Sequence, residues 1–185
     1  MKTQRGVTFI ELIFAISIAG ILISVGIPGF IGSMRNSDMS AAANTFVGAV
    51  HAARSESVKA RSRVTVCRGD TSGANPACDN NGDALIVFIN DANDSSFDNG
   101  TDTLIRSTPW LQDDMSVTAP DLPGYVTFTP QGVTRAINGD AISGTLMLCG
   151  PSGNKHARVV TLSPTGRPVV QHHRDAINPA NCPTT

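Results

Sequence analysis

The feature that most constrains this chain is a run of 20 residues without a charged side chain, from Leu12 to Ile31. As an α-helix the run would rise about 30 Å, which is the thickness of the hydrocarbon core of a bilayer. Lys2 and Arg5 precede it, so the positive-inside rule places the amino terminus in the cytoplasm. The apolar region of a secretory signal spans only about 7–15 residues. The sequence therefore predicts a membrane-spanning segment.

A single carboxylate, that of Glu11, stands at the start of this run. A charge within a bilayer costs about 2.5–3.5 kcal/mol on insertion scales, so an ionisable residue there is a functional hypothesis and needs a cationic partner. The structural alternative is a boundary residue whose side chain reaches the headgroups.

The residues around Glu11 resemble the class III signal of type IV pilins, in which a short basic leader ends in Gly and Glu is the fifth mature residue. The resemblance implies that a prepilin peptidase cuts between Gly6 and Val7 and methylates the new amine of Val7. Counted from Val7, Glu11 is fifth and Pro28 twenty-second, as is common in pilins, although most members have Phe in place of Val7. In a filament, Glu11 could then pair with the amine of a neighbouring subunit's Val7 and set subunit register.

The next residues predict a long helix from about Thr8 to Ala60, roughly 80 Å in length. Pro28 lacks an amide donor, which predicts a kink near residues 27–29. Beyond Met34, small and apolar residues recur at steps of three and four, which predicts one helix face that packs on a sheet. The stripe consists of Met39, Ala43, Phe46, Val50, Ala53, Ser57 and Ala60.

The remainder of the chain is β-rich, so the predicted class is α+β, with the long helix packed on an antiparallel sheet. The predicted strands cover residues 63–67, 84–89, 103–106, 125–129, 144–149 and 158–162. Two segments, 126–132 and 160–166, each enter a Pro-x-Gly turn, which local hairpin chemistry explains. The predicted organisation is a leader at 1–6, a transmembrane helix at 7–33, an amphipathic helix at 34–62 and a β-rich head at 63–185.

The β-rich part also resembles the GspH/FimT branch of the pilin family, which contains pseudopilin H and minor pilins. The resemblance rests on the order of several short segments: 87–88 before an Asn/Asp loop, Leu104, 126–132, 144–149, 163–167 and a final Cys182. It implies the type IV pilin fold, a single-pass inner-membrane location with the β-rich head in the periplasm, and incorporation into a pilus or pseudopilus.

Four cysteines on the outer side of the membrane would meet an oxidising compartment and allow three pairings. The preferred pairing joins Cys67 to Cys78 around a short loop, and Cys149 to Cys182 at the tail; the other pairings remain open. No Cys-x-x-Cys or Cys/His cluster is present, and His172 and His173 are adjacent, so a strand would point them to opposite faces. Neither a metal nor a cofactor is predicted.

Nine acids and one base, Arg106, lie between Asp79 and Asp121. The loop 90–102 has oxygen ligands at alternate spacings, as calcium loops do, but it lacks the twelfth-position Glu and the fixed Gly of an EF-hand. The favoured interpretation is a solvated loop whose Asx side chains cap their own backbone.

The charge reverses after Leu122, with five bases against two acids. In DNA-uptake members of the family a carboxy-terminal Gly-Arg-x-Arg motif contacts DNA, and here only Gly166-Arg167 matches it. Arg167 is therefore the one candidate DNA contact, and an ordinary surface residue is the favoured interpretation. A net charge of −1 argues against bulk nucleic-acid affinity.

These observations predict a structural protein and no enzyme, because no nucleophile with its base, phosphate loop or paired apolar carboxylates is evident. The predicted function is a minor pilin or pseudopilin that primes or caps a type IV pilus or a type II secretion pseudopilus. Its expected partners are major and minor pilins or pseudopilins, the prepilin peptidase, the inner-membrane assembly platform and the membrane itself. The alternatives are a DNA-binding minor pilin for transformation and a membrane-anchored receptor outside any filament.

Overall fold

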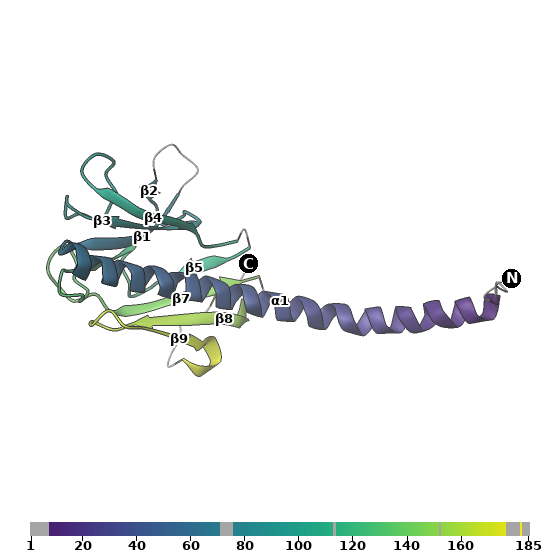
Figure 1. Ribbon diagram of the computed structural model, residues 1–185. Helices are drawn as coiled ribbons and strands as arrows, with labels where there is room; N and C mark the ends of the chain where they lie inside the picture. The colour runs from purple at the N-terminus through teal and green to yellow at the C-terminus, as the bar shows by residue number, and fades with distance from the viewer. Residues whose placement is uncertain (1–7, 71–75, 113, 152, 177–181, 183–185) are drawn as a thin grey trace. The chain divides into compact units, whose positions relative to one another are not determined.

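The computed structural model describes residues 8–70, 76–112, 114–151, 153–176 and 182 (Figure 1). The chain divides into two compact units, an N-terminal unit up to Ser37 and a C-terminal unit from Asp38 onward. One helix, α1 (Phe9–Ala60), contributes to both units. It is followed by β1 (Val64–Asp70), β2 (Ala77–Cys78), β3 (Ala84–Ile89), β4 (Thr103–Pro109), β5 (Ser116–Thr118), β6 (Tyr125–Phe128), β7 (Gly144–Gly150), β8 (Gly153–Leu162), β9 (Pro168–His172) and the 3₁₀ turn η1 (His173–Asp175).

The ends of α1 follow from local chemistry. At its start, Thr8 Oγ1 accepts a hydrogen bond from the Glu11 amide at 3.4 Å, as an N-cap side chain does. At its end, Arg61 adopts a left-handed conformation with φ of 53°, so the helix ends at Ala60. The observed bounds agree with the predicted helix.

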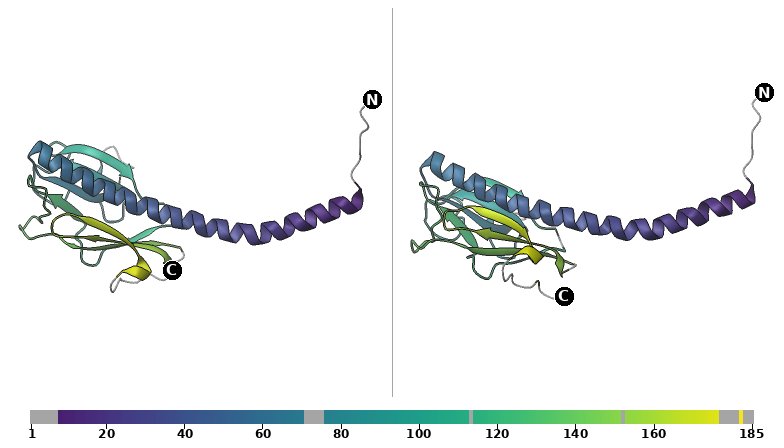
Figure 2. Two further views of the ribbon diagram at one scale, coloured as in Figure 1. Left: turned by 60° about the horizontal axis from the view of Figure 1, so that its bottom comes forward. Right: turned by 90° about the horizontal axis from the view of Figure 1, so that it is seen from below.

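The C-terminal part of α1 buries the predicted stripe. Met39, Ala43, Phe46, Val50, Ala53 and Ser57 are each at most 4 % exposed, whereas Ala60 is half-buried. Ala42 and Ala49 widen the stripe, because they flank it on the helical wheel. This face lies against both sheets of the C-terminal unit (Figures 1 and 2).

The strands form two antiparallel sheets. In the first, the order is β2-β1-β3-β4, and β6 also pairs with β1. In the second, the order is β5-β7-β8-β9. β3 is buried along almost its whole length, as expected for a central strand rich in Val and Ile. The predicted α+β class is confirmed, and the structure adds that the strands divide between two sheets.

All six predicted strands are present, and three further strands were missed. β2 has two residues and β5 three, too few for a periodic pattern to identify. β9 begins with Pro168, and a proline argues against predicting a strand. Proline is nevertheless tolerated as the first residue of an edge strand, which is its position here.

The two Pro-x-Gly segments form the same turn. Gly132 donates to the Thr129 carbonyl at 2.8 Å with φ of 73°, and Gly166 donates to the Ser163 carbonyl at 2.8 Å with φ of 74°. Thr134 Oγ1 donates to the Pro164 carbonyl at 2.8 Å, so the second turn lies against the segment after the first. Hairpin chemistry therefore accounts for the internal similarity.

Candidate functional site

The first candidate site is the start of α1. Thr8 and Glu11 have the Thr-x-x-Glu spacing of a capping box, with Thr8 at the N-cap and Glu11 three residues later. The Glu11 side chain is exposed in the N-terminal unit, as are the apolar side chains around it. Gly6 and Val7, the predicted cleavage and methylation positions, lie outside the described residues.

Among the described residues, none covers the apolar part of α1. It is long and apolar enough to cross a membrane, with a mean hydropathy of 2.4, and no residue of that 18-residue window is buried. Phe9, Leu22 and Phe30 are each at least 67 % exposed. Apolar surface of this extent needs either lipid or other apolar helices around it.

The helix assignment continues through position 28. The kink predicted at Pro28 stays a prediction. A side chain added at Gly20, Gly26, Gly29 or Gly32 would meet nothing within 4 Å, so these glycines are open to another helix.

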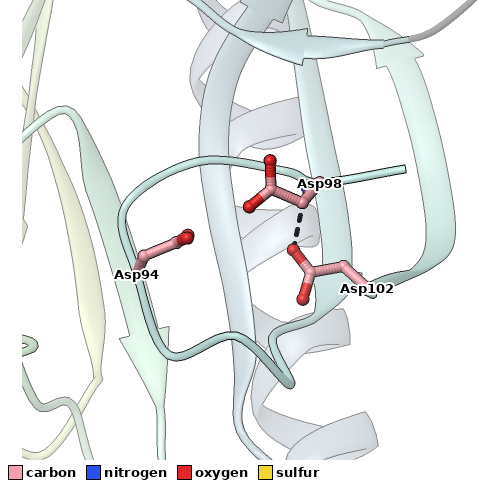
Figure 3. A group of neighbouring side chains, drawn as sticks. All are labelled: Asp94, Asp98 and Asp102. Atoms are coloured by element: carbon pink, nitrogen blue, oxygen red, sulfur yellow. Dashed lines mark hydrogen bonds between the residues drawn. The ribbon is translucent and has the colours of Figure 1, made fainter. Parts of the chain in front are cut away.

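The second candidate site is the acidic loop before β4. The carboxylates of Asp94, Asp98 and Asp102 all lie within 4.8 Å of one another (Figure 3). In the described part of the chain this is the one group of three or more His, Cys, Asp or Glu residues whose ligand atoms gather in this way. The charge of Asp94 raises the pKa of Asp98 above its ordinary value.

Hydrogen bonds explain why the loop takes this form. Buried Asp102 accepts from the Asp91 and Ala92 amides through Oδ1, at 2.9 and 3.2 Å, and from the Asp98 amide through Oδ2, at 3.0 Å. Asp94 in turn accepts from the Ser96 amide at 3.0 Å. Of these bonds, the one from Ser96 to Asp94 is an Asx turn of the kind that the sequence favoured, whereas Asp102 accepts from residues that precede it by four to eleven positions.

A buried polar chain ties this loop to the first sheet. Asn90 Nδ2 donates to Thr65 Oγ1 at 2.8 Å and to the Asp94 carbonyl at 2.7 Å, and its Oδ1 accepts from the Asp94 amide at 3.2 Å. Thr65 Oγ1 also lies 2.8 Å from Thr127 Oγ1 on the paired strand. Asp94 is therefore held by β1 and β6, and three carboxylates in this arrangement can chemically accept a hard cation such as Ca²⁺.

The four cysteines form two disulfides, Cys67–Cys78 and Cys149–Cys182. This is the pairing that the sequence favoured. The first bond closes the β1–β2 end of one sheet. The second holds Cys182 on the outer face of the other sheet, where it packs with Met147, Ala157 and Val159.

Sequence analysis missed the buried Arg158, which it counted only as one of the tail bases. Arg158 is 5 % exposed. Its Nη1 donates to the His156 carbonyl at 3.0 Å and contacts His172 Nδ1 at 2.9 Å, while its Nη2 donates to Ser40 Oγ at 3.0 Å. Burial, followed by the nearby charge of Arg174, lowers the pKa of Arg158. A local pattern could not find it, because Ser40 is 118 residues away.

The structure also shows where His172, His173 and Arg167 lie. His172 ends β9 beside Arg158, and His173 begins η1. Arg167 is exposed after the second turn, where its amide donates to Ser163 Oγ at 3.1 Å. Its contact with DNA stays a prediction.

Comparison with known proteins identifies the family. Residues 42–166 match the model of "Type II transport protein GspH", and residues 1–27 match that of the "Prokaryotic N-terminal methylation motif". Two crystal forms of the type IV minor pilin FimU from Pseudomonas aeruginosa share the fold at 16 % identity, with TM-scores of 0.54 and 0.52. These matches cover 77 % and 75 % of this chain and 94 % and 97 % of FimU.

No curated protein sequence matches the chain significantly. The fold, with a long N-terminal helix on antiparallel sheets, is that of FimU. Proteins of this family and fold are structural proteins. Because the GspH model matches well over half of its length, the chain belongs to the GspH family of type IV pilin-like proteins.

Proposed function

We propose that this protein is a minor pilin or pseudopilin that primes or caps a filament, in a type IV pilus or a type II secretion pseudopilus. The observation that carries the proposal is the division of α1. Its C-terminal part is buried against the sheets, whereas no described residue of the chain covers its apolar N-terminal part. A filament core built from such helices, or the bilayer before assembly, supplies that cover.

In this proposal, Glu11 fixes how neighbouring subunits are aligned during assembly. A carboxylate among apolar helices is penalised by several kcal/mol unless a cation pairs with it. The cation proposed is the amine of a neighbouring subunit's Val7, freed when a prepilin peptidase cuts after Gly6. The match to the methylation motif supports this processing step.

The experiment replaces Glu11 by Gln and by Ala in cells that assemble the filament. Gln at this position keeps the capping-box residue and removes only the charge, whereas Ala removes both. Loss of incorporation for both variants is expected, with normal membrane levels of the subunit. Thr8→Val is the matched control, since it removes the cap and leaves the carboxylate. Incorporation of Glu11→Gln at the wild-type level would contradict the register role.

Processing and topology are tested separately. Mass spectrometry of the mature chain should find an N-methylated Val7 at its start, and an intact Gly6 there would refute the cleavage.

We propose a single pass through the inner membrane, with residues 7–33 in the bilayer and the C-terminal unit in the periplasm. Protease added to spheroplasts should then degrade the C-terminal unit.

Subunits of a type IV pilus and of a type II secretion pseudopilus have the same leader and helix, so these features do not distinguish the two systems. The neighbouring genes do. A neighbouring cluster of pilus minor-pilin genes supports the pilus, and a secretion operon supports the pseudopilus. Deletion of the gene, followed by assays of twitching, protein secretion and transformation, gives the same distinction.

A further inference from the structure

The corner formed by β8, β9 and η1 holds three of the four histidines of the chain. His156 lies in β8, His172 ends β9, and His173 begins η1. Histidine is the side chain whose ordinary change of charge falls between pH 5 and 8, so a corner of this kind can respond to acidity. Whether it does so depends on what each ring contacts.

The contact between Arg158 and His172 determines which form of the His172 ring fits. Arg158 Nη1 lies 2.9 Å from His172 Nδ1. A guanidinium has only N–H donors and keeps its charge in proteins, so Arg158 is the donor of this bond. Nδ1 must therefore offer a lone pair, which the neutral ring with its proton on Nε2 provides. A second proton, on Nδ1, would place two donors and two positive charges against each other.

Arg158 cannot simply turn away from a protonated ring. It is 5 % exposed, and other hydrogen bonds hold its guanidinium in place. Nη1 also donates to the His156 carbonyl at 3.0 Å, and Nη2 donates to Ser40 Oγ of α1 at 3.0 Å. Because these bonds fix the cation, His172 is the partner that must move when it becomes charged.

The charges around His172 also disfavour its protonated form. The charged and titratable groups come from two elements, Arg158 and His156 from β8 and His173, Arg174 and Asp175 from η1, while α1 contributes the Ser40 hydroxyl. Asp175 is the acid of this set, and its Oδ1 lies 3.7 Å from Nε of Arg174. A protonated His172 would thus join two guanidinium groups that share one carboxylate.

β9 is placed so that it can open without the rest of the sheet. Among the described residues it pairs only with β8, and the pair of Arg158 with His172 stands at one end of that ladder (Figure 1). Val169 and Val170 are 47 % and 38 % exposed, so opening gives up little buried apolar surface. His172 and Asp175 also border a hollow in the surface, through which solvent protons reach the ring.

We infer that the contact of Arg158 with His172 is an acid-sensitive latch, which holds β9 and η1 on β8 while His172 is neutral and releases them when it is protonated. The closed latch requires the neutral ring, whereas the open latch admits both forms, so opening increases as pH falls. An exposed imidazole takes up its proton around pH 6.5, and at pH 5.5 about ten protonated rings stand for each neutral one. β9 should therefore open about tenfold more often at pH 5.5 than at pH 7.5. The latch lies within the C-terminal unit, so it is independent of the proposed role in a filament.

The test is hydrogen exchange of the full-length chain in neutral detergent micelles, followed by mass spectrometry at pH 7.5 and pH 5.5. The exchange rate of each segment is divided by the rate of an unstructured chain at the same pH, which removes the intrinsic effect of pH on exchange. Protection of β9 should fall about tenfold at pH 5.5, whereas that of the central strand β3 should not change. No fall in β9, or an equal fall in β3, would overturn the latch.

The decisive variant is His172→Asn. Its Oδ1 stands where Nδ1 stood and accepts from Arg158 at either pH, so protection of β9 should be the same at pH 7.5 and pH 5.5. The matched controls remove the other histidines one at a time, and each should keep the tenfold fall: His51→Asn, His156→Asn and His173→Asn. A fall that persists in His172→Asn, or that is lost in a control, would contradict the assignment to His172.

Nitrogen-15 NMR of the wild-type chain, labelled at histidine, tests the contact without any substitution. At pH 7.5 the His172 ring should show an unprotonated Nδ1 and a protonated Nε2. A proton on Nδ1 at that pH would overturn the latch, because Arg158 would then find no acceptor there.

Discussion

The glycine of the second Pro-x-Gly turn gives a sharp test of how the C-terminal unit is packed. Gly166 has φ of 74°, a conformation that costs an alanine about 1–2 kcal/mol. A Cβ at this position would lie 3.1 Å from Cζ of Phe128 and closer still to Cε1. Phe128 is fully buried, so its ring cannot move aside easily.

Two other glycines separate backbone strain from this overlap. Gly139 has φ of 91° and nothing within 4 Å of its added Cβ, so Gly139→Ala should cost only the strain, about 1 kcal/mol. Gly132 has φ of 73°, and its nearest neighbour is the Val58 side chain at 3.1 Å, so about 1–2 kcal/mol is expected. Gly166→Ala adds overpacking of about 1–3 kcal/mol to the strain, for a total of about 2–5 kcal/mol.

The assay is urea unfolding followed by tryptophan fluorescence. Trp110 is the single tryptophan of the chain and is 7 % exposed. It stacks on Phe46 at 5.6 Å between ring centroids and donates to the Ala42 carbonyl at 2.8 Å, so it reports on the C-terminal unit alone. The expected order of destabilisation is Gly166→Ala, then Gly132→Ala, then Gly139→Ala.

A double variant tests the cause directly. Phe128→Leu makes room beside position 166, so the combined cost of Phe128→Leu and Gly166→Ala should be smaller than the sum of the two single costs. Strict additivity, or a Gly166→Ala cost no larger than that of Gly139→Ala, would refute the argument from overlap.

Three further predictions follow from charge and covalent structure. The Asp94 charge raises the pKa of Asp98, so the ionised Asp98 opposes folding at neutral pH, and this penalty disappears as pH falls through the raised pKa. Asp98→Asn should therefore raise the melting temperature at pH 7. It should leave the melting temperature unchanged near pH 3, about one unit below the pKa of an ordinary Asp. By loop entropy, loss of Cys149–Cys182, with a separation of 33, should cost about 3.7 kcal/mol, and loss of Cys67–Cys78, with a separation of 11, about 2.8 kcal/mol, as measured by urea unfolding of Cys→Ser pairs. If Arg167 contacts DNA, Arg167→Gln should lower affinity in a gel-shift assay and flatten its salt dependence, and no shift by the wild-type chain at low salt would end the DNA hypothesis.

The local features of this structure could be predicted from the sequence. The spacing from Met39 to Ser57 specified which helix face is buried, and the β-branched runs specified the six main strands. The two Pro-x-Gly segments specified their turns, because glycine adopts the positive φ that both turns need without the steric cost that a side chain brings. The leader and the order of the later segments were enough to identify the family.

Features that depend on distant residues were not accessible in this way. The division into two sheets depends on which strands pair across the chain, and the pattern of one strand does not contain that choice. Arg158 looked like a surface base, and its burial depends on Ser40 and His172. The gathering of Asp94, Asp98 and Asp102 depends on Asn90, whose buried side chain holds the loop to β1.

The tail disulfide has a consequence for timing. Cys182 is made after every strand of the described fold, whereas Cys67 and Cys78 are made before β3. The first bond can therefore form on a nascent chain, while the second must wait until both sheets have been synthesised. Until then the outer face around Met147 and Val159 lacks Cys182, so oxidation at this position marks a chain in which every described strand has already been made.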